Sequence, residues 1–304
     1  MKGKFRVRVS NAKVRYDFEL RRNITVVQGN SGTGKTTLFD MVAEHTRLKE
    51  KSGVNVSCDV PVVALIDIDW KNQLKNIRRS IVLIDEGANY ITSKDFSKAI
   101  NKSDNYYLLF TRESLYELPY SVTEIYRIKT SGKYHSLEPL YKEKKGHIFG
   151  RASQRAINQT DVILLEDTKA GYQFYKAAFS GSHIVCEAAG ANSSIYNWLC
   201  ANMDKTVYII ADGAAFGAQM NRVMTANSIH PDRVIVCLPE SFEWLILKSE
   251  LIKTKTVKKI LDNTYEFADS KQYFSWEQFY TDYLVKETSK TPFKYKKANY
   301  IEIK

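Results

Sequence analysis

The sequence predicts an α/β protein with two parallel-sheet domains and a basic, aromatic C-terminal tail. Three observations lead to this fold class. A glycine-rich turn, residues 29–36, joins an apolar strand to a segment with helical periodicity. Apolar runs of strand length alternate with helical segments along much of the 304 residues, which is typical of a parallel sheet covered on both faces. Several runs end in acidic residues, as expected at the ligand-binding edge of such a sheet.

The first domain is expected over residues 1–145 and begins with an antiparallel β-hairpin. Residues 5–19 alternate apolar and polar side chains around a turn candidate at Ser10 and Asn11. The glycine-rich turn follows, between the strand from Ile24 and a helix that reaches about Lys51. The further elements predicted are strand 60–68, helix 70–79 and strands 81–86, 106–111, 121–128 and 135–141. Residues 142–150 are charged and contain glycine, so we expect a linker there.

The second domain is expected over residues 146–250, smaller than the first and of the same alternating kind. Its predicted elements are strand 162–165, helix 170–179, strand 183–187, helix 193–201, strand 207–211, helix 218–226 and strand 234–238. Residues 251–304 are rich in lysine and aromatic side chains. We expect one or two helices there, followed by a weakly ordered tail.

Composition limits the class of protein. The hydrophobic fraction of 44% is ample for folded cores, and the formal charge of +11 favours an anionic partner such as nucleic acid. The four cysteines form no C-x-x-C pair, so we expect buried free thiols in a reducing compartment. No apolar run approaches the ~18 residues that span a bilayer, and the N-terminus has no secretory signal pattern. We therefore expect a cytoplasmic protein without a membrane partner.

The glycine-rich turn has the strand, loop and helix context of a phosphate-binding P-loop (Walker A). Its candidate nucleotide-binding residues are Gly29, Asn30, Ser31, Gly32, Thr33, Gly34, Lys35, Thr36 and Thr37. Glycines let successive backbone N–H groups face an anion, while Lys35 neutralises β- and γ-phosphate charge and the Thr36 hydroxyl is placed to ligate Mg²⁺. The alternative is a glycine turn with a solvated lysine.

A metal-holding acid is needed at the end of a neighbouring strand, and Asp85 after IVLI supplies it. Glu86 is placed to orient or deprotonate an attacking water, so Asp85-Glu86 resembles the Walker B element of ATP-hydrolysing P-loop proteins. Asp67 and Asp69 in LIDID compete for this role, but no glutamate directly follows Asp69.

Thr111 and Arg112 follow another apolar strand. In P-loop ATPases a polar residue at such a strand end senses the γ-phosphate, and an arginine can act as an arginine finger. The alternative for both is a solvated strand end. The first domain thus resembles a reduced ABC-like or AAA-like ATPase core, which implies ATP and Mg²⁺ as cofactors and allows a homo-oligomer. It has no LSGGQ-like signature for the usual contact across a dimer.

In the second domain, Glu166 follows the strand 162–165 and Asp212 follows the strand 207–211. With the glycine turn 189–191 between them, these acids resemble the Toprim domain of topoisomerases, primases and OLD-family nucleases, over about residues 161–243. The resemblance implies a metal site at Glu166 and Asp212. Toprim nucleases carry Asp-x-Asp on the third strand, whereas this chain has Ala214 in place of the second acid. Asp167, Glu240 and Glu243 are possible substitutes, and an ordinary flavodoxin-like sheet is the alternative.

An ATPase core before a Toprim-like domain resembles the OLD-type arrangement of bacterial anti-phage defence and mobile-element proteins. It implies a magnesium-dependent hydrolase that couples ATP to nucleic-acid processing. The alternatives are a nucleotide-dependent switch with an inactive Toprim-like half and a P-loop kinase acting on a small molecule. We also expect the tail to contact nucleic acid, through phosphate attraction and base stacking. The residues are Phe293, Lys294, Tyr295, Lys296, Lys297 and Tyr300.

Overall fold

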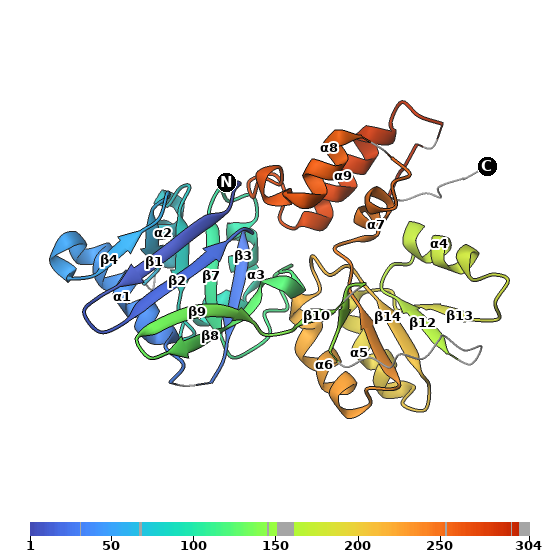
Figure 1. Ribbon diagram of the computed structural model, residues 1–304, viewed down its shortest axis with the longest axis horizontal. Helices are drawn as coiled ribbons and strands as arrows, with labels where there is room; N and C mark the ends of the chain where they lie inside the picture. Colours follow the sequence, from blue (N-terminus) through green and yellow to red (C-terminus); the bar gives the residue numbers. More distant parts are fainter. Residues whose placement is uncertain are drawn as a thin grey trace. The chain divides into compact units, whose positions relative to one another are not determined.

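The computed structural model describes residues 1–30, 32–66, 69–144, 146–150, 161–252, 254–292 and 294–297. They form an α/β protein of two compact units (Figure 1). The first unit contains Met1–Leu140 together with Asp262–Ser275. The second contains Tyr141–Leu261 and the described residues from Trp276 onward. The chain therefore leaves the first unit, returns to it for a short segment, and then re-enters the second.

Within the described residues, the first unit has one mixed sheet of nine strands in the order β4-β1-β2-β9-β8-β3-β7-β6-β5. The strands are β1 Phe5–Ser10, β2 Arg15–Leu20, β3 Ile24–Gln28, β4 Asn55–Ser57, β5 Val62–Ala64, β6 Ile81–Ile84, β7 Tyr106–Thr111, β8 Ile125–Ser131 and β9 Tyr134–Pro139. The α-helices are α1 Lys35–Leu48, α2 Trp70–Asn76 and α3 Lys94–Ile100. Short 3₁₀ turns cover Lys49–Ser52, Asn89–Thr92, Val122–Glu124 and Thr264–Glu266.

Strands β8, β3, β7, β6 and β5 are parallel, as expected for the centre of this unit. The predicted antiparallel hairpin β1–β2 is confirmed, and it joins the same sheet as the parallel strands, so this sheet is mixed. Strand β2 pairs with β9, β9 is antiparallel to β8, and β4 pairs antiparallel with β1. The hairpin thereby extends the parallel strands with an antiparallel layer.

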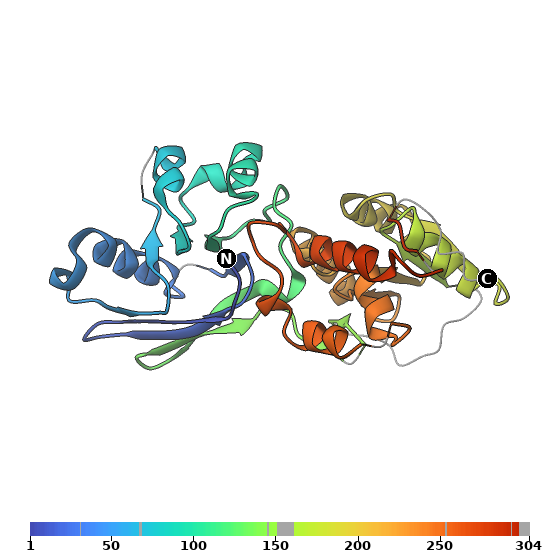
Figure 2. The same cartoon turned by 90° about the horizontal axis from the view of Figure 1, so that it is seen from above.

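Helix α1 lies at the centre of the first core. It packs against β1 and β4 near one end of the strand order and against β5 and β6 at the other, so the sheet curls around it. Leu38 and Val42 are fully buried, and each such side chain contributes about 1.5–3 kcal/mol by leaving water. Figure 2 shows α2 and α3, in cyan and teal, on the side of the parallel strands opposite the dark-blue β1–β2 hairpin. This packing fixes the loop that precedes α1.

The sheet of the second unit has the order β10-β11-β15-β14-β12-β13. Its strands are β10 Glu143–Lys144, β11 Ile148–Phe149, β12 Val162–Leu165, β13 Val185–Ala188, β14 Val207–Ile210 and β15 Val234–Cys237. Its helices are α4 Ala170–Ala178, α5 Asn192–Ala201, α6 Met220–Ile229 after the 3₁₀ turn Gly217–Gln219, α7 Phe242–Lys248, α8 Lys255–Asp262 and α9 Trp276–Thr288. Strands β13, β12, β14 and β15 are parallel, so the alternation read from the sequence is confirmed there.

Four local expectations were wrong. The expected linker 142–150 forms β10 and β11 at the edge of the second sheet, because Phe149 is buried and pairs with β15. Helix α3 was missed, although Ser93 caps it by accepting a hydrogen bond from the backbone N of Phe96 at 3.1 Å. The four cysteines are free but none is buried, and Cys200 is exposed. The described part of the tail is not loose, since Tyr295 is 2% exposed.

None of the helices in the described ranges combines the length and the apolar character needed to cross a membrane.

Candidate functional site

The predicted residues of the first unit meet at one edge of its sheet. Strands β3, β7 and β6 are parallel neighbours in that order, so the segments after their carboxyl ends emerge together. The loop 29–36 follows β3, Thr111 and Arg112 lie at the end of β7, and Asp85 and Glu86 follow β6. One strand therefore separates the loop from the two acids.

The described part of the loop has the backbone that its glycines allow. Gly32 and Gly34 have φ of 79° and 95°, in the left-handed region that disfavours other residues. A Cβ atom at Gly34 would also lie 2.9 Å from the hydroxyl oxygen of Tyr16. That hydroxyl donates to the carbonyl oxygen of Gly34 at 2.9 Å, and α1 begins at the next residue. Predicted Ser31 lies outside the described residues.

The ammonium of Lys35 is turned into the loop. Its Nζ donates to the carbonyl oxygens of Gly29 and Asn30, the latter at 2.9 Å, and approaches Thr33 Oγ1 at 3.5 Å. The side chain is only 4% exposed, and Nζ lies 3.5 Å from an oxygen of Glu86. A cation held against loop carbonyls is positioned to attract phosphate oxygens into the same space.

Glu86 is held by two cations. Arg112 contacts both of its oxygens, with Nη2 2.6 Å from Oε1 and Nε 3.3 Å from Oε2, and Lys35 is the second cation. The hydrogen bond from Arg112 is the main reason that the pKa of Glu86 is lowered. Arg112 is 56% exposed, so the pair lies at the rim of the site. In this arrangement Glu86 is a poor base until Arg112 moves away.

Asp85 fits a role in holding a cation. Its Oδ1 is buried and accepts no hydrogen bond from the described residues. A buried acceptor without a hydrogen bond lowers the stability of the folded state by about 1–3 kcal/mol unless a ligand satisfies it. Burial, and then the charge of Asp85, raise the pKa of Asp40 on α1, so the two carboxyl groups are close enough to interact. Together with the hydroxyl of Thr36, these oxygens suit Mg²⁺, which takes one or two carboxylates and keeps its waters.

A pocket of about 330 Å³ joins these groups to the antiparallel layer. Its lining consists of Val14, Tyr16, Gly32, Thr33, Gly34, Lys35, Thr36, Thr37, Glu86, Arg112, Thr130 and His135. The rings of Tyr16 and His135 stack with centroids 4.5 Å apart. The Nε2 atom of His135 is buried and has no hydrogen-bond partner among the described residues. The pocket thus combines the glycine-rich loop with an aromatic face and a polar atom that has no partner among the described residues.

The competing acids do not join this pocket as far as they are described. Asp67 lies outside the described residues. Asp69 directly precedes α2, and its Oδ2 accepts a hydrogen bond from Nδ2 of Asn72 at 2.6 Å. Asp69 thus belongs to the start of a helix.

The second unit brings Glu166 and Asp212 together. Strands β12 and β14 are parallel with Leu165 opposite Ile210, so the two acids emerge at the same edge, as the sequence predicts. An oxygen of Glu166 accepts a hydrogen bond from the backbone N of Asp212 at 3.0 Å. An oxygen of Asp212 accepts one from the backbone N of Phe242 at 3.1 Å.

A lysine lies at this acidic edge. The Nζ atom of Lys297 is 2.5 Å from Oε1 of Glu277. Burial alone lowers the pKa of Lys297, but the carboxylates of Glu277, Glu243 and Asp212 together raise it above its usual value. Burial raises the pKa of Glu166 to about 7 and that of Asp212 well above its usual range, and Lys297 opposes both shifts.

The expected Mg²⁺ does not fit here as well as it fits the first unit. In both units alike, the described residues include no group of three or more His, Cys, Asp or Glu side chains arranged to hold a metal ion, so the difference between the two sites is the lysine at this edge. Lys297 brings a positive charge near the two acids, although its ion pair is with Glu277. The prediction of a shared metal site at Glu166 and Asp212 thus gains no support from the electrostatics of this edge.

Two of the three possible substitutes for the missing acid, Asp167 and Glu243, have other partners. Asp167 caps α4 by accepting hydrogen bonds from the backbone N atoms of Lys169 and Gly171, each at 2.8 Å. Glu243 is 2% exposed and accepts a hydrogen bond from the hydroxyl of Tyr295 at 2.8 Å. Ala214 is also 2% exposed, so an aspartate there would be buried.

Tyr295 and Lys297 are functional candidates of a different kind from the expected one. The tail was predicted to offer them to nucleic acid, but the Tyr295 ring is buried and Lys297 pairs with Glu277. Lys294, Lys296 and Lys297 are all exposed, so tail binding to nucleic acid remains a prediction for these three lysines. Phe293 and Tyr300 lie outside the described residues. Sequence reasoning missed Glu277, whose only signal was an acid on an aromatic-rich helix.

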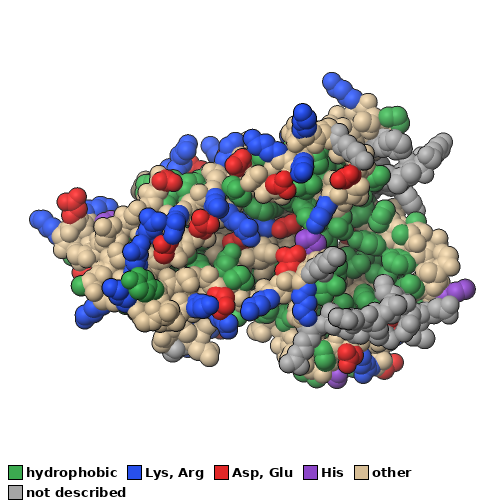
Figure 3. All heavy atoms as spheres, in the orientation of Figure 1, with side chains coloured by type: hydrophobic (Ala, Val, Ile, Leu, Met, Phe, Trp, Pro, Cys, Tyr) green, Lys and Arg blue, Asp and Glu red, His purple; other side chains and the backbone are tan. Residues whose placement is uncertain are grey.

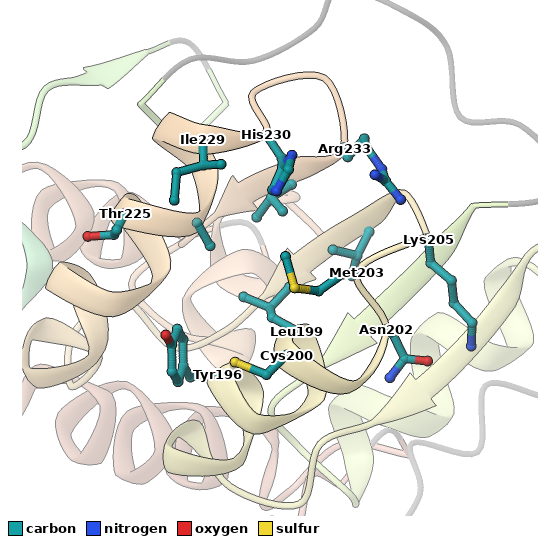
Figure 4. A pocket seen from close by; sticks show the side chains of 13 residues that line it. Tyr196, Leu199, Cys200, Asn202, Met203, Lys205, Thr225, Ile229, His230 and Arg233 are labelled. Atoms are coloured by element: carbon teal, nitrogen blue, oxygen red, sulfur yellow. The ribbon is translucent and has the colours of Figure 1, made fainter.

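The second unit also has a pocket, which its lining residues place away from Glu166 and Asp212 (Figure 4). It has a volume of about 160 Å³ and is lined by α5, α6 and the first residues of β14 and β15. Leu199, Met203 and Ile229 give it an apolar character, with His230 and Arg233 beside them (Figure 4). Ligands of open α/β sheets bind at the carboxyl ends of the strands, whereas this pocket is at the amino ends.

Comparisons of the chain with known protein families, with curated proteins and with solved structures gave no match. Function is therefore inferred from the motifs and from the geometry of the two sheet edges.

Proposed function

We propose that the first unit binds ATP with Mg²⁺ in the pocket between the loop 29–36 and the Tyr16–His135 pair, and hydrolyses it. The observation that carries the proposal is the convergence of Lys35, Glu86 and Arg112 on one pocket with that loop. No two of these three side chains are close in sequence. If the loop were only a solvated glycine turn, there would be no reason for these three side chains to lie in one pocket.

Each residue has a distinct part in this proposal. The loop N–H groups and the start of α1 bind the phosphates, and Lys35 leaves the loop carbonyls to pair with them. Thr36 and Asp85 would hold the metal ion. When bound, the ion would neutralise the charge that develops on the phosphates. The stacked rings of Tyr16 and His135 offer a face to the base.

Arg112 and Glu86 then act as a pair that the nucleotide separates. A γ-phosphate competes for the guanidinium of Arg112, which frees the Glu86 carboxylate to orient a water. Glu86 directly after Asp85 favours hydrolysis over the alternative of a small-molecule kinase, because a kinase has to exclude water as the acceptor. Thr111 is a weaker candidate for the γ-phosphate sensor, since its hydroxyl bonds with the backbone of Glu113 at 3.0 Å.

For the second unit, we propose a nucleic-acid-binding role without metal-dependent cleavage at Glu166 and Asp212. Lys297 favours this role over a Toprim-like nuclease, since an ammonium neutralises acids but cannot activate water as a metal does. Nucleic-acid cleavage by the purified protein that requires Mg²⁺ or Mn²⁺ and is lost in Asp212→Asn would contradict it.

The test of hydrolysis separates binding from turnover. Glu86→Gln keeps the size and hydrogen bonding of the side chain but loses the carboxylate that positions water. ATP should still bind while the hydrolysis rate falls by roughly 10²-fold or more, the range for a positioned acid–base group. Glu113→Gln, a nearby acid of the same type outside the pocket lining, is the control and should keep the wild-type rate. Equal rates in Glu86→Gln and wild type would move the water-positioning role elsewhere.

A further inference from the structure

A basic groove lies at the amino-terminal edge of the parallel strands in the first unit. It has a volume of about 440 Å³ and is lined by α2, the end of α3 and the loops that lead into β6 and β7. Its cations are Lys71, Lys75, Arg78, Lys102 and Lys271. The loop 29–36 and Glu86 follow the carboxyl ends of parallel strands in this sheet, so the groove and the nucleotide pocket lie at opposite edges.

The returning segment 262–275 completes this groove with Lys271. The Oγ of Ser270 donates to the carbonyl oxygen of Ser103 at 3.1 Å, and Nδ2 of Asn23 donates to the carbonyl oxygen of Phe274 at 2.8 Å. The backbone N of Lys271 itself donates to Asp269 at 2.9 Å. These bonds fix Lys271 beside the loop before β7, although it is far from that loop in sequence.

Two of the five cations already have local roles. Lys71 forms an ion pair with Asp95 at 2.5 Å. The guanidinium of Arg78 donates to the carbonyl oxygens of Leu74 and Ile77, at 3.5 and 3.0 Å, and so caps the end of α2. Arg78 keeps its charge, because neither partner is an acid.

The other three cations are exposed and have no carboxylate partner among the described residues: Lys75, Lys102 and Lys271. Lys75 donates a hydrogen bond to Oδ1 of Asn72 at 3.3 Å, which leaves its charge unneutralised. Among the described residues that line the groove, Asp104 is the one acid, and its Oδ1 accepts a hydrogen bond from the backbone N of Arg79 at 3.4 Å. The groove thus has a clear excess of positive charge.

Neutralisation of helix ends accounts for only part of this charge. Lysine in the last turn of a helix is favoured by the helix dipole, which explains Lys75 on α2. Lys102 follows α3 and Lys271 lies on a different segment. On the face of the first unit seen in Figure 3, basic side chains alternate with acidic ones, as on an ordinary solvated surface. The ion pairs Arg6–Asp17 and Arg127–Glu138 of the antiparallel strands are examples.

We propose that this groove binds the sugar-phosphate backbone of a nucleic acid. A concave channel with cations on three segments suits a strand-like polyanion, because phosphates along the strand meet successive lysines. An anionic membrane surface fits less well, since membrane-binding faces usually add exposed apolar anchors, and Leu74 in this groove is 6% exposed. The proposal goes beyond the nucleic-acid role proposed above for the second unit by naming a surface on the first unit, and binding here requires neither ATP nor the acidic edge of the second unit.

The lining also predicts the kind of recognition. None of the described residues that line the groove is aromatic, so bases have no side chain on which to stack. Contacts to phosphate alone carry no sequence information and depend strongly on salt. Binding should therefore be insensitive to base sequence and should weaken steeply as salt rises.

The test is a triple variant, Lys75→Ala with Lys102→Ala and Lys271→Ala. Fluorescence anisotropy with a labelled duplex, and with a single strand of the same sequence, is measured without nucleotide over a range of salt. The variant should bind about 10- to 100-fold more weakly, and the slope of log K against log salt should fall by about 2–3, as expected for three lost phosphate contacts. The strand form that loses more affinity identifies the preferred partner.

The control is a second triple variant with the same loss of charge, Lys13→Ala with Lys51→Ala and Lys133→Ala, at exposed positions of the first unit that do not line the groove. It should keep near-wild-type affinity and slope. Equal loss in both triple variants would reduce the effect to net charge and overturn the proposal. Unchanged nucleic-acid binding in the groove variant would also overturn it. So would a groove variant that loses binding to phosphatidylserine vesicles but keeps its binding to nucleic acid.

ATP binding by the groove variant separates this proposal from the nucleotide-binding one. Because the two sites lie at opposite sheet edges, the variant should bind ATP as the wild type does. That result also shows that the first unit is folded. Single substitution Lys102→Ala, which should weaken nucleic-acid binding by a smaller factor, keeps the test open if the triple variant is unstable.

Discussion

Glu166→Gln should change how the stability of the second unit depends on pH. Burial raises the pKa of Glu166 from its ordinary value of 4.5 to about 7. The folded state therefore holds this proton more tightly than the unfolded state. Its stabilising effect is complete below about pH 4.5 and is lost as the pH rises through about 7. Glutamine stays neutral throughout and still accepts the hydrogen bond from the backbone N of Asp212.

The pKa difference sets the size of the effect. At about 1.4 kcal/mol for each pKa unit, the wild type should lose roughly 1–3 kcal/mol relative to Glu166→Gln across this range. The lower figure allows for the solvent that reaches this partly exposed side chain. Urea denaturation at several pH values measures the difference, followed by tryptophan fluorescence in a Trp70→Phe background, where the remaining tryptophans lie in the second unit. The exposed Asp204→Asn is the control and should follow the wild type. Parallel pH profiles for wild type and Glu166→Gln would refute the reasoning.

Three further predictions concern the two sheet edges. His135→Ala should weaken ATP binding in calorimetry by about 0.5–1.5 kcal/mol, the range for an aromatic stack, while the affinity for inorganic tripolyphosphate stays unchanged; equal losses for both ligands would exclude a base contact. Arg112→Ala should raise the pKa of Glu86 toward its ordinary value, because the main hydrogen bond that lowers this pKa is lost. The acid limb of the ATPase pH–rate profile should change as a result. An unchanged profile would mean that the Arg112–Glu86 pair plays no part in turnover. Lys297→Met should let Mn²⁺ raise the melting temperature, since the resident cation is removed, whereas wild type should show no rise; stabilisation of the wild type by Mn²⁺ would contradict the role given to the lysine.

The meeting of the loop 29–36 with Glu86 and Arg112 was largely predictable from the sequence, because these parts carry local signals. The glycines, Lys35 and the apolar strand before them are contiguous, and Asp85 and Glu86 follow a buried strand. The rule that parallel strands deliver their carboxyl ends to one edge then brings these segments together. The stack of Tyr16 on His135 had no such signal, since it depends on the antiparallel layer joining the same sheet.

The acidic edge of the second unit was only half readable. The convergence of Glu166 and Asp212 follows from strand ends, and the structure brings them together. The contribution of Lys297 and Glu277 does not follow, because a chain segment far along the sequence returns to this unit after α8. From the sequence alone, a charged tail residue that forms an ion pair cannot be distinguished from one that is exposed to solvent.

The basic groove, like the acidic edge, is built from segments that are far apart in the sequence. Lys75, Lys102 and Lys271 lie in three separate stretches, none of which is a lysine cluster dense enough to indicate a binding patch. The short helix α3 beside it has seven residues, too few for a clear periodic pattern, and only its Ser93 cap could have revealed it. Long-range contacts, rather than local periodicity, build both features.

Titration calorimetry of Mg-ATP into wild type and Lys35→Ala tests the nucleotide-binding proposal most directly. The substitution removes the side-chain cation held within the loop, which we propose pairs with the phosphates, while Leu38 and Val42 in the core around α1 are unchanged. We predict one binding site in the wild type and a severe loss of affinity in Lys35→Ala, with circular dichroism spectra that coincide. Absence of ATP binding by the wild type, or equal affinity in the two proteins, would contradict the assignment of the loop 29–36 as a phosphate-binding loop.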